Sequence, residues 1–321
     1  MMCSICGDII KAIDHYIAMA DDDLKDELED EGRALPDDSV KMANNLEDGI
    51  AAALISETNY FIEQIKKQNS VADLMDLLEQ IREQDIVNEE IERVAAEQLK
   101  KFIPKMVVHY AMDVDEGIKI TAVSKRTTAW IDAWSKELGE LMKLNSNTEI
   151  ENILNKALES GDDIQTVTRT ILDSGIRDEY YKARRVALTE LFRAHNVSRY
   201  EASLQSPCIV SKRWRHSGRG KPRPNHKAMD GVTVPKNEPF VLQGADGSTY
   251  YPMHPVDSCL PAGEAVNCHC TVDDVVDEEI LGLSTEERQK LRDEALAELD
   301  DEWEKSVDEK YRALVGLSTE D

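Results

Sequence analysis

Aromatic residues and long apolar runs are scarce in this sequence of 321 residues. Phe, Trp and Tyr make up 5% of the chain, whereas Asp, Glu, Lys and Arg make up 32%. So few rings among so many charges predict charged-surface helices rather than a β-sandwich. No apolar run approaches the roughly 20 residues that cross a bilayer, and the first residues lack the basic region of a secretory signal peptide. We therefore expect no membrane partner and synthesis in a cytoplasm.

Six cysteines in a chain of this length do not indicate a disulfide scaffold. Cys268 and Cys270 are one residue apart, a spacing that suits joint metal ligation better than a bond between them. With His226 they form a ligand set soft enough for a structural zinc ion. The candidate fourth ligands are His254, Cys259 and His269. The alternative is that both cysteines pack as small apolar side chains and that His226 caps a turn.

Another cysteine motif lies at the start of the chain. Cys3 and Cys6 form a Cys-x-x-Cys pair at a predicted helix start, on which Ile5 and Ile9 begin an apolar stripe. Because no further ligands accompany this pair, we interpret it as fortuitous rather than as a metal site.

Acidic residues outnumber basic ones, and the formal net charge is -26. Such a chain repels DNA on average, so any contact with nucleic acid needs a local basic patch. Residues 182–236 supply one, with thirteen basic and three acidic side chains and a net charge of +10, against -36 for the remainder. These side chains either bind DNA phosphates without sequence specificity or bind acidic surfaces, including this protein's own helices. The seven expected to make such contacts are Arg184, Arg185, Arg193, Arg213, Arg215, Arg219 and Lys221.

The first two thirds of the chain have the three- and four-residue apolar periodicity of helices. We assign the apolar stripes to the protein core rather than to a cofactor site. A break is expected at residues 145–148 and another at Gly175, and Pro104 should kink or divide its helix. Pro207 should end the last helix. The predicted helices cover residues 39–67, a stretch beginning at 69, 91–110, 121–144, 149–160, 163–174 and 177–206.

The composition changes after Pro207, where Gly and Pro become frequent. Short extended segments are expected over 208–210, 231–234 and 239–242. Ser284 and Glu287 then form a capping box that starts an acidic amphipathic helix. We therefore predict a mainly α protein with a small loop-rich α+β domain. Its four parts are a helical N-terminal region (1–144), a helical segment (145–206), the α+β domain (207–276) and a terminal acidic helix (277–321).

A series of motifs runs through the predicted α+β domain. Trp214 precedes the box Arg223-Pro224-Asn225-His226-Lys227-Ala228-Met229-Asp230-Gly231, and Pro239-Phe240, Tyr251-Pro252 and Asn267-Cys268-His269-Cys270 follow. In order and spacing, residues 183–271 resemble the C-terminal domain of the phage Mu F-like minor head proteins, a family of head-morphogenesis proteins. One departure is His269, which stands where the family usually has arginine. Asp230 and Gly231 are expected to build a turn, with Gly231 at a positive φ.

The resemblance implies a non-enzymatic minor capsid protein of a tailed phage or prophage. Such a protein would assemble in the host cytoplasm and enter the virion head at the portal vertex. It would assist head assembly and DNA packaging or exit, with portal, capsid or scaffold proteins as partners and DNA as a further partner of the basic patch. The alternative is a nuclease or toxin-like enzyme with His226 as general base and Asp230 orienting it.

Overall fold

The computed structural model describes residues 20–68, 73, 83, 86–218 and 222–314. Cys3, Cys6, the helical stretch predicted from residue 69, Arg219 and Lys221 lie outside these ranges. After a helical segment at 20–30, the long helices are α2 (Pro36–Lys66), α4 (Val87–Val114), α5 (Lys125–Ser160) and α6 (Ile164–Gln205). The strands are β1 (Ile209–Arg215), β2 (Thr233–Pro235), β3 (Leu242–Gln243), β4 (Thr249–Tyr250) and β5 (Thr271–Val276). The remaining helices are α7 (Pro224–Ala228), α8 (Ala262–Ala265), α9 (Glu278–Leu281) and α10 (Thr285–Leu314).

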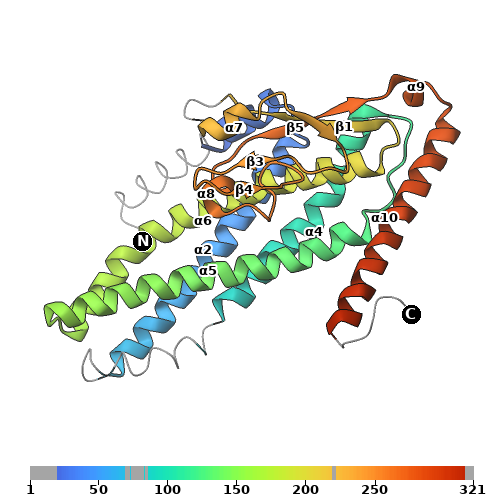
Figure 1. Ribbon diagram of the computed structural model, residues 1–321. Coiled ribbons are helices and arrows are strands. Elements are labelled where there is room, and N and C mark those ends of the chain that lie inside the picture. Colours follow the sequence, from blue (N-terminus) through green and yellow to red (C-terminus); the bar gives the residue numbers. More distant parts are fainter. Residues whose placement is uncertain (1–19, 69–72, 74–82, 84–85, 219–221, 315–321) are drawn as a thin grey trace, which may run out of the picture.

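The predicted fold class, mainly α with a small α+β region, is confirmed. Helices α2, α4, α5 and α6 pack against one another, and the strands and short helices gather over one end of α6 (Figure 1). β1 lies in the centre of a three-stranded antiparallel sheet, paired with β2 on one side and β5 on the other, while β3 and β4 form a separate antiparallel pair. No helix within the described ranges is both long enough and apolar enough to span a membrane.

Local sequence explains several helix ends. The side chains of Ser124 and Asp163 cap α5 and α6 by accepting bonds from the amides of Thr127 and Thr166. Gly161 ends α5 at φ 69°, a conformation that glycine adopts without steric cost. The capping box at Ser284 forms as predicted, with hydrogen bonds to Glu287 in both directions.

Two predicted helix breaks are wrong. Helix α5 runs without interruption through residues 145–148, so the expected boundary at 144 falls inside it. Helix α6 likewise continues through Gly175. Polar residues and single glycines cost a helix only about 1 kcal/mol or less each, and packing of the apolar faces on either side outweighs that cost. Pro104 is also accommodated within α4 and does not divide it.

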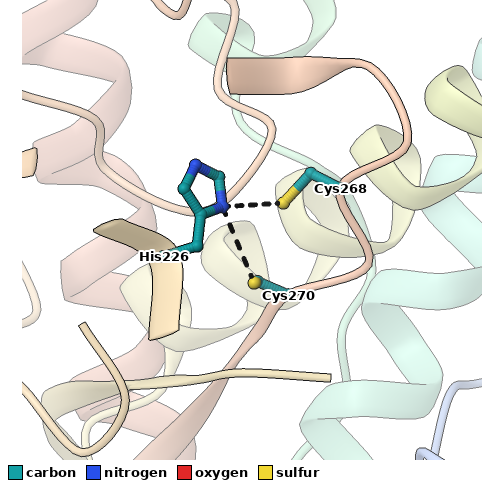
Figure 2. A group of neighbouring side chains, drawn as sticks. All are labelled: His226, Cys268 and Cys270. Carbon is teal, nitrogen blue, oxygen red and sulfur yellow. Dashed lines mark hydrogen bonds between the residues drawn. The ribbon is translucent and has the colours of Figure 1, made fainter. Parts of the chain in front are cut away.

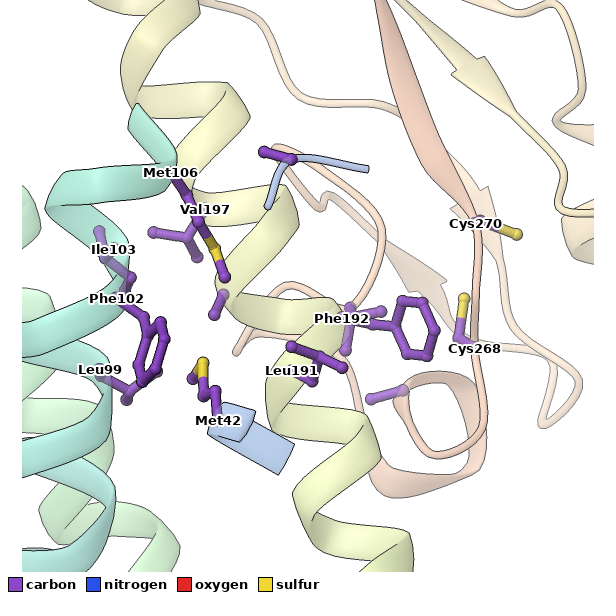
Figure 3. Packing of buried hydrophobic residues seen from close by; sticks show 14 of the residues in the cluster. Met42, Leu99, Phe102, Ile103, Met106, Leu191, Phe192, Val197, Cys268 and Cys270 are labelled. Carbon is purple, nitrogen blue, oxygen red and sulfur yellow. The ribbon is translucent and has the colours of Figure 1, made fainter. Parts of the chain in front are cut away.

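One apolar core joins the long helices to the strand region. Met42, Phe102 and Leu191 come from three different helices, and Phe192 on α6 faces the segment of Cys268 and Cys270 (Figure 3). The same cluster reaches Trp214 on β1 and the β5 residue Val272. α6 is therefore the element that connects the helical region to the residues of the motif series.

Candidate metal centre

The three predicted metal ligands lie together, although they come from two separate segments. His226 lies in α7, and Cys268 and Cys270 lie in the turn between α8 and β5 (Figure 2). The Nδ1 atom of His226 is 3.4 Å from Sγ of Cys268 and 3.8 Å from Sγ of Cys270. All three residues are buried, with 2–3% of their surface exposed.

The local backbone explains this convergence. Pro224 occupies the first turn of α7, where its missing amide costs no helical hydrogen bond. Asn267 adopts a left-handed conformation with φ 58°, which turns the chain after α8. Side chains two residues apart in extended chain lie on the same side, so both sulfur atoms face His226.

The spacing of the donor atoms fits a tetrahedral zinc ion. With Zn–S bonds of about 2.3 Å and Zn–N bonds of about 2.0–2.1 Å, a sulfur and a nitrogen ligand lie about 3.5 Å apart. The two distances from Nδ1 bracket this value, and all three donor atoms lie within 4.8 Å of one another. Thiolate and imidazole are also ligands of suitable softness for zinc. The three residues present therefore fit the metal.

The two thiols have opposite pKa shifts. A hydrogen bond from Cys268 lowers the pKa of Cys270 to about 4, against the effect of burial and with further help from His226. The same hydrogen bond, together with burial, raises the pKa of Cys268 well above its usual value. The backbone amides of Ser217 and Cys270 also donate to the sulfur atoms of Cys270 and Cys268 respectively. Such amides stabilise thiolates, which is the form that ligates a metal.

Glu264, on α8, holds the other side of the His226 ring. Its Oε2 atom lies 2.8 Å from Nε2 of His226 and also accepts from the side chain of Asn225. Burial favours the neutral acid, but bonds from the amide of Ala245, from Asn225 and from His226 lower the pKa of Glu264. A carboxylate in this position fixes the imidazole so that Nδ1 faces the sulfur atoms, as second-shell carboxylates do in metal sites.

Glu264 cannot be singled out from the sequence. Its position three residues before Asn267 carries no pattern that distinguishes it from the other acidic residues of the chain. The contact with His226 depends on the fold, which brings α8 beside α7.

The remaining motif residues build the frame of the site. The Trp214 ring is fully buried and meets the rings of His226 and Phe240 edge to face, at centroid distances of 5.8 and 5.3 Å. The guanidinium of Arg223 donates to the carbonyl of Val266, immediately before Asn267, at 2.5 Å. The two chain segments that carry the candidate ligands are therefore tied together by contacts other than the ligands themselves.

None of the three candidate fourth ligands joins the cluster. Among the described residues, the cluster comprises His226, Cys268 and Cys270 alone. His254 bonds the carbonyl of Pro255, and Cys259 is exposed. His269 points the other way, 2.7 Å from Glu27, with its ring against Phe192. A zinc ion held by these three residues would need one further donor to reach four-coordination.

Asp230 does not orient His226, which contradicts the pairing required by the enzyme alternative. Helix α7 ends before Asp230, and its Oδ1 atom accepts from the amide of His216 at 2.8 Å. Gly231 follows at φ 81°. The expectation that these two residues build a turn is confirmed, and the carboxylate that contacts His226 is Glu264 instead.

A second chemical interpretation of the cluster is a thiol nucleophile. Cys270, His226 and Glu264 form a chain of nucleophile, base and orienting carboxylate, which is the general arrangement of thiol enzymes. A nucleophile must reach its substrate, however, and Cys270 is only 3% exposed. The geometry therefore suits a metal held inside the protein better than attack on an external substrate.

Part of the predicted basic patch makes contacts within the protein. Arg184 bonds Asn44 and Glu47 of α2, both at 2.8 Å. Arg193 is 3% exposed, pairs with Glu190, and stacks on Trp134 with 4.0 Å between the guanidinium carbon and the ring centre. These arginines lie on α6, and their contacts hold the surrounding helices and loops.

The strand arginines divide between internal and exposed positions. Arg215 donates to the carbonyl of Glu31 at 2.7 Å and pairs with Asp273 at 3.1 Å. Arg213 and Arg185 are exposed. Arg184, Arg193 and Arg215 thus each pair with an acidic side chain of this protein.

Comparison with known proteins agrees with the motif series. The family model described as "Phage Mu protein F like protein" matches residues 148–273, from within α5 to within β5. The "Uncharacterized protein YqbB" of Bacillus subtilis (strain 168) is 31% identical over 306 residues, which cover 91% of this chain and 98% of that protein.

A second relative matches over a shorter segment. The "NAD(+)--arginine ADP-ribosyltransferase EFV" of Enterococcus faecalis (strain ATCC 700802 / V583) is 31% identical over 137 residues, 41% of this chain and 25% of that protein. No solved structure matches the chain significantly. The family model and the near-complete match to YqbB together show that the chain belongs to the phage Mu protein F-like family.

Proposed function

We propose that this protein is a structural component of the phage head that joins the prohead at the portal vertex and assists head assembly and the packaging or exit of DNA. Its family connects it broadly with phage head morphogenesis, with other phage structural proteins as partners. Assembly in the host cytoplasm followed by incorporation into the virion follows from the same role. The portal vertex as its place in the head, and its help in packaging, are the finer parts of the proposal.

The observation that carries the proposal is how the motif residues are used. Trp214, Arg223, Asp230 and Asn267 all make contacts that shape the protein's own interior and turns. The His-Cys-Cys cluster is buried. Motif residues that stabilise the protein's own fold support a role in assembly in which the protein catalyses no reaction.

We further propose that His226, Cys268 and Cys270 hold one structural zinc ion. A bound zinc ion would supply a positive charge that stabilises both thiolates and would link α7 to the turn before β5. Around it, Glu264 orients His226, and Trp214 and Phe240 exclude water. This strand region is small and has few large apolar side chains, so such a link would add to its stability.

The assembly role is tested by following the tagged protein through head assembly. Proheads are purified from infected or induced cells by sedimentation, both from wild-type phage and from a mutant that lacks the portal protein. We expect the tagged chain to sediment with wild-type proheads and to be lost from portal-deficient ones. Its absence from wild-type proheads would contradict the assembly role. Equal retention in portal-deficient proheads would contradict only the portal location.

A further inference from the structure

A long, mainly apolar groove runs between α5 and α6 and reaches α8 at one end. It encloses a hollow of about 760 Å³ and is floored by Leu54 and Thr58 of α2. Leu260 and Val266, on either side of α8, close one end. A hollow of this size lies within the range of sites that take up a ligand and far exceeds a packing void.

The shape of the groove is that of a rod. On α5 its lining extends from Trp134 to Lys156, and on α6 from Ile171 to Arg193. At 1.5 Å per residue, each wall is about 33 Å long. Three apolar α5 residues of the lining, Trp134, Leu138 and Leu141, recur at four- and three-residue steps, which places them on one face of that helix. A groove between two antiparallel helices of equal length has a shape that can accommodate a third helix.

The groove lies where three apolar clusters meet without merging. Trp134 belongs to the main core, Ile171 to a cluster at the far end of the helices, and Leu138 to a third cluster between α2, α4 and α5. All three residues line the hollow. Leu141, also in the lining, is 45% exposed. An apolar side chain set into the groove would join these clusters and cover that exposed surface.

The mouth of the groove is positively charged. Lys156, Lys182 and Arg185 border it, and Glu149 pairs with Lys182. Lys156 and Arg185 are exposed. The ion pair of Glu190 and Arg193 in the lining neutralises itself. The groove is thus a cationic site on a chain whose net charge is -26, and it favours an occupant with acidic flanks.

We infer that the groove between α5 and α6 binds an amphipathic helix of a partner protein, with an apolar face set against Trp134, Leu138 and Leu141 and acidic residues beside Lys156 and Arg185. This is a helix-in-groove contact, in which apolar anchors at three- and four-residue steps enter a hydrophobic channel. The inference goes beyond the proposed role in head assembly and does not require a bound metal.

The test uses fluorescein-labelled peptides and the full-length protein. One peptide of 22 residues carries Leu at alternating three- and four-residue steps, flanked by Glu, with Ala elsewhere. A second replaces each Glu by Lys, and a third scrambles the first. We expect fluorescence anisotropy to show at least tenfold tighter binding of the acidic peptide than of the other two. Circular dichroism should show that the peptide gains helicity when it binds.

Matched variants locate the binding surface. Leu141→Glu should abolish binding, and Lys156→Glu should weaken it about tenfold, the equivalent of 1.4 kcal/mol. The controls are Leu158→Glu, also on α5 and 38% exposed but outside the lining, and Lys136→Glu, an exposed α5 residue outside it. Neither control should change the affinity.

Several outcomes would overturn the inference. Equal affinity for the acidic and basic peptides, or no loss of binding with Leu141→Glu, would do so. Self-association of the wild type that Leu141→Glu disperses would assign the groove to a second copy of this chain. Displacement of the peptide by dodecanoate, with tighter binding of that fatty acid alone, would assign it to a small amphiphile.

Discussion

At the scale of single residues, the fate of the arginines shows what a charge count along the sequence leaves out. A net charge of +10 over residues 182–236 looks like a surface for nucleic acid. In the folded chain, Arg193 is buried against Trp134, and Arg184 reaches across to α2. Local charge density predicts a surface only where the side chains reach solvent, and burial depends on tertiary contacts that the sequence does not display.

The candidate metal ligands could be predicted from the sequence, whereas Glu264, which contacts His226, could not. Cys268 and Cys270 are separated by a single residue, and their residue types limit what they can do. Glu264 is one of 64 acidic residues, and only the fold distinguishes it by placing it 2.8 Å from His226. Second-shell residues act through geometry, so a single sequence rarely identifies them.

If the proposed zinc site is correct, replacing either buried cysteine should abolish zinc binding. We expect wild-type protein refolded with zinc to hold about one zinc ion per chain, as measured by mass spectrometry, and Cys268→Ser and Cys270→Ser to hold almost none. Both variants should also unfold at a lower temperature. Cys259→Ser is the matched control, since Cys259 is exposed and outside the cluster. Wild-type protein that stays free of zinc would contradict the metal assignment.

Lys212 is a buried lysine whose replacement should stabilise the protein. It is 1% exposed, and its Nζ has no hydrogen-bond partner in the described part of the chain. It lies over the ring of Tyr200 at 4.5 Å. Burial lowers the pKa of Lys212 to about 7. Between pH 7 and the usual value near 10.5, the unfolded chain therefore binds a proton that the folded chain does not, so this residue makes stability rise with pH.

Lys212→Met should consequently raise the free energy of unfolding by about 1–3 kcal/mol at pH 6. The gain should shrink toward zero as the pH approaches 10. Urea titrations of both proteins at several pH values measure this difference. Lys136→Met, at an exposed position on α5, should give no pH-dependent gain. A gain that stays constant between pH 6 and 10 would show that charge burial at Lys212 is not its cause.

At the scale of elements, the sequence pattern predicted where helices form but not where they continue without a break. The apolar periodicity identified the helical stretches, but the polar residues 145–148 and Gly175 suggested breaks that α5 and α6 do not have. Each signal is worth about 1 kcal/mol or less, whereas burying one large apolar side chain contributes about 1.5–3 kcal/mol. Ile150 and Leu154, just beyond the expected break in α5, are both buried. The free energy gained by burying them outweighs the cost of the polar residues, so the helix continues.

Helices α4 and α5 approach closely at Gly139, and this contact should not tolerate a side chain. A Cβ atom there would lie 2.3 Å from the backbone carbonyl oxygen of Asn88, which cannot rotate away. We expect Gly139→Ala to separate the two helices and to lower the free energy of unfolding by about 1–3 kcal/mol. Alanine's better helix propensity recovers only part of that loss.

Gly263→Ala is the matched control for this contact. Gly263 is also helical, and a Cβ atom there would meet nothing within 4 Å. Thermal unfolding followed by circular dichroism measures both variants. A Gly139→Ala protein as stable as the wild type would show that α4 and α5 do not pack this closely in solution.

At the scale of the whole molecule, the balance of charge argues against strong binding of duplex DNA. The chain carries -26 overall, and three of the predicted contact arginines make internal bonds. We expect electrophoretic shift assays at about 150 mM salt to show no submicromolar affinity for duplex DNA. The exposed Arg213→Ala variant should behave like the wild type. A submicromolar affinity that falls steeply with salt would contradict this prediction and would indicate that exposed basic side chains bind DNA phosphates.

The shared core makes a prediction about how the molecule unfolds. The main apolar cluster extends from Leu24 through the long helices to Val272, so the strand region and the helical region bury much of their apolar surface against each other. Neither can lose its structure without exposing the core of the other. We therefore expect one cooperative transition in urea rather than separate transitions on either side of the boundary predicted at residue 206.

Two probes on one variant test this prediction. Trp130→Phe, Trp134→Phe and Trp303→Phe together leave Trp214 as the single tryptophan, so its fluorescence reports on the strand region, while ellipticity at 222 nm reports mainly on the long helices. The two curves should coincide in midpoint and slope. Because Trp214 lies on β1 beside the candidate metal centre, a fluorescence change at lower urea would show that residues 207–276 form an independent domain. Coincident curves in the presence of a chelator would show that α6 and the shared core, rather than a metal, couple the two regions.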